Sequence, residues 1–75
     1  METTDLSQLI DCLANPDSVV RERSARSLAE IGPRAEAATP ALIERLTDEA
    51  QTVRTAAAFA LSQVRPNPSL RSRLW

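Results

Sequence analysis

The chain has 75 residues and a formal net charge of −1 at pH 7, and only 3% of its residues are aromatic. A chain of this length forms one small domain near the lower size limit for an independent core, which alanine, leucine, isoleucine and valine must supply. The near-neutral total excludes attraction of nucleic acid by a strongly basic net charge, and the lack of lysine and histidine excludes Schiff-base and imidazole chemistry.

The first predicted element is an amphipathic helix that precedes Asn15. Thr4 or Asp5 can cap its start, and the Asn15–Pro16 step ends it, because the residue before a proline disfavours helical geometry. The apolar residues of this helix recur at intervals of three and four, as expected for one buried face: Leu6, Leu9, Ile10 and Leu13.

A second helix is predicted after the turn, with Asp17 or Ser18 as its N-cap. It ends at Gly32, which we expect to adopt a left-handed backbone conformation ahead of Pro33. One face of this helix carries its small and apolar residues: Val20, Ser24, Ser27, Leu28 and Ile31.

The pattern then restarts after a connector over residues 33–38. Thr39 is the predicted N-cap of a third helix, Pro40 its first residue, and Thr47–Asp48 its end, with Ile43 and Leu46 on the inner face. A fourth helix is predicted from about Gln51 to Val64, and its inner face holds Val53, Ala57, Ala60, Leu61 and Val64.

An internal repeat with a period of 33 residues relates the two halves. The matching pairs are Leu9/Leu42, Ile10/Ile43, Leu13/Leu46, Val20/Val53, Arg21/Arg54, Ala25/Ala58 and Leu28/Leu61. Periods of this size are typical of solenoids, in which stacked units share one core. We therefore predict a repeat domain over residues 1–65, with repeats at about 4–32 and 39–65, and a tail or truncated third repeat over residues 66–75.

The segments LANPDSVVR (residues 13–21), IGPRAEAATPAL (31–42) and LIERLTDEAQTVR (42–54) resemble HEAT repeats, and most closely the bacterial phycobilisome-lyase HEAT-like subtype. This resemblance implies an all-α fold: a short right-handed α-solenoid of two helix-turn-helix repeats plus a truncated third. It also implies a ladder in which an arginine after valine pairs with a turn acid, with Asp17 and Asp48 as the acids and Arg21 and Arg54 as the bases. Ala50 departs from the pattern, since the family places a second acid there.

Candidate partner-binding residues lie on the second and fourth helices, which line the concave face in HEAT stacks. Arg23 and Arg26 can form part of a binding face, although Glu22, Arg26 and Glu30 at intervals of four also fit a solvated stripe. Phe59 aligns with Arg26 in the repeat, and Gln63 follows one turn later. Phe59 is either an exposed anchor for a partner or is covered by Leu70, Leu74 or Trp75 of the tail.

The tail carries the last two candidates, Leu74 and Trp75. An aromatic residue in this position either docks as a makeshift cap on the repeat stack or inserts into a partner. With Phe59, these two residues are expected to form one contact surface. Cys12 is expected to be a small, partly buried hydrophobe rather than a reactive thiol, since no histidine is available to activate it.

The function predicted from these features is a non-catalytic protein-interaction or assembly module in the bacterial cytoplasm. No catalytic residues, metal ligands or cofactor are expected, because one glycine cannot build a phosphate loop and the acids lie on turns and solvated faces. The expected partner is a protein, in a homodimer or a larger complex, with no membrane contact. An accessory role in a lyase-like complex and an arginine-based nucleic-acid module are the alternatives.

Overall fold

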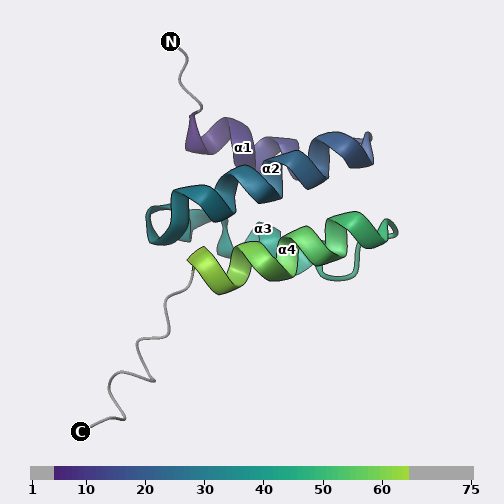
Figure 1. Cartoon of the computed structure of the whole chain (residues 1–75). Helices are drawn as coiled ribbons and strands as arrows, with labels where there is room; N and C mark the ends of the chain where they lie inside the picture. Colours follow the sequence, from purple (N-terminus) through teal and green to yellow (C-terminus); the bar gives the residue numbers. More distant parts are fainter. Residues whose placement is uncertain (1–4, 65–75) are drawn as a thin grey trace, which may run out of the picture.

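A computed structural model describes residues 5–64. The elements are α1 (Leu6–Cys12), α2 (Ser18–Ile31), the 3-10 helix η1 (Gly32–Ala38), α3 (Thr39–Arg45) and α4 (Gln51–Val64). The long helices α2 and α4 lie side by side, with α1 and α3 behind them, so each repeat contributes one helix to each layer (Figure 1). Over the described residues the fold is all-α, a short helical repeat solenoid.

The turn that precedes α2 is held by side chains next to the proline. The Asn15 side-chain carbonyl accepts a hydrogen bond from the Asp17 backbone N–H at 2.8 Å. Asp17, the N-cap residue of α2, then accepts one from the Val19 N–H at 2.9 Å, which satisfies a donor that the helix leaves free. The predicted cap residue Asp17 is therefore in place, whereas Asp5 at the start of α1 makes no side-chain cap bond.

Gly32 ends α2 with φ = 75°, a backbone conformation that side chains rarely adopt. The nearest atom to a Cβ built there is the Gln63 carbonyl oxygen at 3.9 Å, so backbone conformation rather than crowding requires glycine. This positive φ lets the chain turn directly into η1 and bring α3 behind α4.

The start and end of α3 differ from the prediction. Thr39 was predicted as the N-cap, but it is the first residue of the helix, and Ala38, one residue earlier, is the N-cap. The Thr39 hydroxyl is buried without a hydrogen-bond partner among the described residues, because η1 runs straight into α3 and leaves the preceding backbone helical. The helix ends at Arg45, earlier than the predicted Thr47–Asp48.

The core is built from aliphatic side chains of both repeats. Its largest fully buried members are Leu13, Leu28, Leu42, Val53 and Val64. Alanines at the contact between α2 and α4, such as Ala25, Ala57 and Ala60, are completely buried and let the two helices approach closely. Within residues 5–64, none of the helices combines the length and the apolar character needed to cross a bilayer.

The prediction that Ile43 and Leu46 line the inner face of α3 is wrong. Ile43 is 48% exposed and Leu46 is 38% exposed, while their neighbour Leu42 is fully buried. The periodic pattern identified an apolar stripe, but α4 covers only one edge of it. Ile43 and Leu46 lie on the opposite edge, where no described residue of the chain covers them.

Candidate functional site

Arg21 joins the turns of the two repeats from a buried position at the start of α2. Its Nε donates to Asp48 Oδ2 at 2.8 Å, and its Nη2 donates to Asp48 Oδ1 at 3.0 Å. Its Nη1 donates to the backbone carbonyls of Asn15 at 2.6 Å and Pro16 at 3.0 Å. A planar guanidinium matches a carboxylate in this two-bond geometry, so one side chain fixes repeat one against repeat two.

Asp48 is the acceptor at the centre of this bridge, and its side chain is only 2% exposed. Besides Arg21, its oxygens accept from the Ala50 N–H at 2.9 Å and from Arg45 Nη1 at 3.2 Å. The hydrogen bonds from Arg21 hold the pKa of Asp48 below its usual range, against the opposing effect of burial. The same pair raises the pKa of Arg21, so both groups are charged near neutral pH.

The Asp48 carboxylate gives the fold a component of stability that is lost in acid. Its pKa in the folded chain lies below the ordinary value of 3.8, so the unfolded chain binds the proton more readily. This stabilisation is present above about pH 4 and decreases as the pH falls toward the folded pKa. We expect the melting-temperature difference between the wild type and Asp48→Asn, measured by circular dichroism from pH 7 to pH 2, to shrink below about pH 4. A melting-temperature difference that stays constant over this range would contradict the lowered pKa of Asp48.

Arg54, the repeat-two equivalent of Arg21, is exposed and makes only half of the same contacts. Its Nη1 donates to the carbonyls of Asp48 at 2.7 Å and Glu49 at 3.3 Å, which are the counterparts of Asn15 and Pro16. No carboxylate in residues 5–64 pairs with it. The Asp17 carboxylate does not pair with Arg21 either, because the guanidinium of Arg21 reaches forward to Asp48 in the next turn. The four residues of the expected ladder therefore contain one bidentate pair, Arg21–Asp48.

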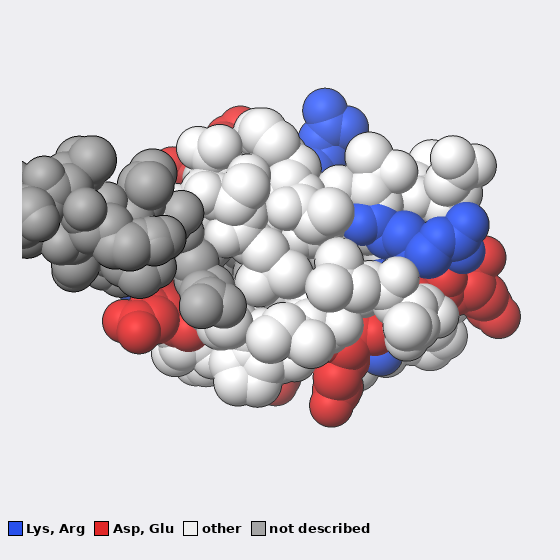
Figure 2. Space-filling view, turned by 90° about the horizontal axis from the view of Figure 1, so that it is seen from below, with Lys and Arg blue, Asp and Glu red and all other residues white. Residues whose placement is uncertain are grey.

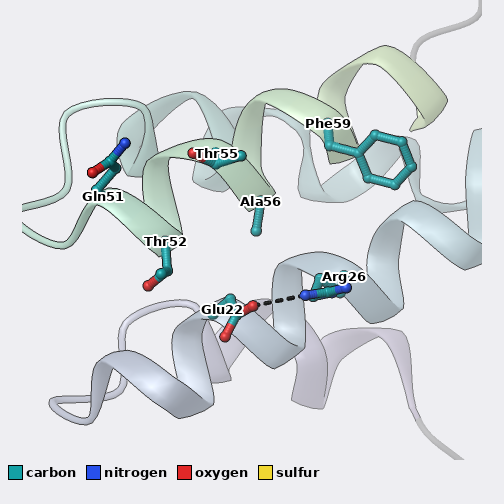
Figure 3. Close-up of a pocket in the computed structure, with 7 residues that line it drawn as sticks. All are labelled: Glu22, Arg26, Gln51, Thr52, Thr55, Ala56 and Phe59. Carbon is teal, nitrogen blue, oxygen red and sulfur yellow. Dashed lines mark hydrogen bonds and ion pairs between the residues drawn. The ribbon is translucent and has the colours of Figure 1, made fainter.

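A groove with a volume of about 480 Å³ lies between α2 and α4 on the outer side of their layer (Figure 3). One wall comes from α2, with Glu22 and Arg26, and the other from α4, where Thr52 and Ala56 point toward α2. The lining residues are Glu22, Arg26, Gln51, Thr52, Thr55, Ala56 and Phe59. This surface, named the α2–α4 groove below, has polar Gln51 and Thr52 at one end and Phe59 at the other, with the charged Glu22 and Arg26 on the α2 wall.

The chemistry of the α2–α4 groove is that of a binding surface. Arg26 Nη1 donates to Glu22 Oε2 at 2.9 Å, so the groove's two charged side chains neutralise each other. Phe59 is 55% exposed, a large apolar area for a side chain that faces water. Within the described residues, no group of three or more histidine, cysteine, aspartate or glutamate side chains could hold a metal ion.

The structure brings two of the predicted partner-binding residues together, Arg26 and Phe59. Arg23 and Gln63 are exposed but do not line the groove, and Leu74 and Trp75 lie outside the described residues. Sequence reasoning missed the other lining residues. The repeat held a signal for two of them, Glu22 and Thr55, which are equivalent at the offset of 33 residues that also relates Arg26 and Phe59.

Comparison with known protein families gives one match. A family model described as HEAT repeats matches residues 6–74, nearly the whole chain. Neither the curated proteins nor the solved structures contain a match to the chain.

Proposed function

Since the chain belongs to the HEAT repeat family, we propose that it is a non-catalytic interaction module that binds a protein partner through the α2–α4 groove. HEAT repeats generally mediate protein–protein interaction or scaffolding, and the family is typically non-catalytic. The choice of this face and of its residues is the part that goes beyond family membership.

The exposed ring of Phe59 carries the proposal. Aromatic residues dominate the binding energy of protein interfaces when they fill a pocket and lose their water. Phe59 lies at one end of a groove whose remaining wall offers hydroxyls, an amide and a neutralised ion pair. Such a surface suits a peptide or helix that brings one apolar side chain and several hydrogen-bonding groups.

The partner we propose is a second copy of the chain or a subunit of a larger complex. Residues 5–64 hold two repeats, and about three or more repeats are normally needed for stability, which supports association with another protein. Arg26 is paired with Glu22, which weakens the case for a phosphate-binding surface. A phosphate-binding module would show a steep loss of affinity with added salt, whereas an apolar contact around Phe59 would not.

We expect Phe59→Ser to weaken partner binding while leaving the fold intact. A photo-reactive amino acid at Thr55, inside the groove, should crosslink a defined protein in cells that express the chain. Phe59→Ser should reduce this crosslink, because loss of an aromatic anchor costs roughly 2 kcal/mol or about thirtyfold in Kd. Mass spectrometry identifies the captured protein, and sedimentation shows whether it is a second copy.

Val19→Ser is the matched control for this experiment. Val19 is 54% exposed, close to the 55% of Phe59, and it lies on α2 without lining the groove. The crosslink should survive Val19→Ser. Equal losses from both variants, or a crosslink that neither variant affects, would show that the groove is not the binding face.

A further inference from the structure

The two repeats bury their equivalent residues unequally. Leu13 is 2% exposed, but its repeat-two equivalent Leu46 is 38% exposed. The same contrast holds for Arg21 and Arg54, of which the first is buried and the second exposed. Two further pairs follow it: Ala25 is fully buried and Ala58 exposed, and Leu28 is fully buried and Leu61 half-buried.

These differences have one geometric cause. Repeat two covers the face of repeat one that holds Leu13, Arg21 and Leu28. The corresponding face of repeat two, named the α3–α4 end face, consists of Ile43, Leu46, Arg54, Ala58 and Leu61. Figure 2 views the molecule from this side, where uncharged residues occupy most of the described surface and basic and acidic side chains lie around its edge. The end face thus repeats a surface that, one unit earlier, is an interface.

The guanidinium of Arg54 contacts its own turn as that of Arg21 does, but it has no partner equivalent to Asp48 within residues 5–64. Both arginines use Nη1 to hold the two backbone carbonyls of their own turn, at 2.6 and 3.0 Å for Arg21 and at 2.7 and 3.3 Å for Arg54. In Arg21 the remaining nitrogens Nε and Nη2 hold Asp48. In Arg54 the same two nitrogens have no acceptor within residues 5–64. The guanidinium is thus held in place with two donors available for a carboxylate.

We propose that the α3–α4 end face docks a helical hairpin of a partner protein whose turn presents an aspartate to Arg54. The partner helix that follows this turn carries small aliphatic residues, because Val53, Ala57 and Ala60 fill that role against repeat one. Ile43 and Leu46 supply the apolar contact beside the ion pair. This surface is separate from the α2–α4 groove.

Two other occupants of the end face lack the required chemistry. Residues 65–75 contain three arginines, Arg65, Arg71 and Arg73, and no aspartate or glutamate, so no side chain of this segment can pair with Arg54. A second copy stacked head to tail would present Asn15 where Asp48 pairs with Arg21. It would also present Arg23 in place of Ala56, which is 7% exposed at the contact between the repeats.

The proposal can be tested by giving the chain the residues that would let a second copy dock on the α3–α4 end face. Asn15→Asp supplies the missing turn carboxylate, and Arg23→Ala restores the small side chain. Asn15 Oδ1 accepts from the Asp17 N–H, and an aspartate can accept the same bond, so the fold should persist. Both changes are made in a Phe59→Ser background, which removes any association through the α2–α4 groove.

The expected result is head-to-tail association measured by sedimentation equilibrium. The Kd of the Asn15→Asp/Arg23→Ala chain should be at least about tenfold lower than that of the Phe59→Ser parent, because truncation studies give close interfacial charge pairs effects of this size or larger. Adding Arg54→Gln should return the Kd to the parent value, with helicity unchanged by circular dichroism. The proposal is overturned if Asn15→Asp/Arg23→Ala associates no more tightly than the parent, or if Arg54→Gln leaves the new association intact. Neither outcome bears on the groove.

Discussion

Replacing Arg21 with alanine should lower the melting temperature of the chain by more than about 10 °C, whereas Arg54→Ala should change it by only a few degrees. The substitution is the same, and the two residues are equivalent in the repeat. Arg21 is buried, and its loss leaves the carboxylate of Asp48 in a site that is 2% exposed with only Arg45 to offset its charge. Arg54 is exposed, and the carbonyls that it releases can bind water.

Thermal unfolding followed by circular dichroism gives both values under one set of conditions. A double variant, Arg21→Met with Asp48→Leu, identifies the cause of the loss. Replacement of a buried ion pair by apolar residues is often neutral or stabilising, whereas removal of one partner is costly. We therefore expect the double variant to melt well above Arg21→Ala. Equal losses for Arg21→Ala and Arg54→Ala would mean that the bridge between the repeats adds nothing to stability.

Leu13→Ala should destabilise the chain by about 2–5 kcal/mol, while Leu46→Ala should cost less than about 1 kcal/mol. Leu13 is 2% exposed in the core, so its truncation leaves a cavity between the repeats. Leu46 is 38% exposed, and water can fill part of the space that it leaves. A domain of this size has a total stability near the low end of the usual range of about 5–15 kcal/mol, so Leu13→Ala should be largely unfolded at 37 °C.

Urea unfolding of the two leucine variants at low protein concentration provides the measurement. Low concentration keeps any association of the chain from contributing to the measured free energy of unfolding. A loss at Leu46 as large as that at Leu13 in the dilute monomer would contradict the burial described above.

The local sequence determined most of the helical framework. Apolar residues at intervals of three and four predicted the helices, and the Asn15–Pro16 step with Asp17 predicted the turn before α2, because these effects act within a few residues. The period of 33 residues predicted the stack of two units. Gly32 was predicted for the same reason, since glycine lacks a Cβ and tolerates the positive φ that ends α2.

Tertiary structure decided which residues meet and which remain exposed. Arg21 and Asp48 are 27 residues apart, and only the stacking of the two repeats brings the guanidinium to the second turn rather than to Asp17. The apolar stripe of α3 contains Leu42 and Leu46 alike, yet only the first has a helix packed over it. A sequence pattern marks the surface that a helix can bury, but the neighbouring layer determines how much of that surface is covered. For that reason the α2–α4 groove and the exposure of Arg54 emerge only from the folded chain.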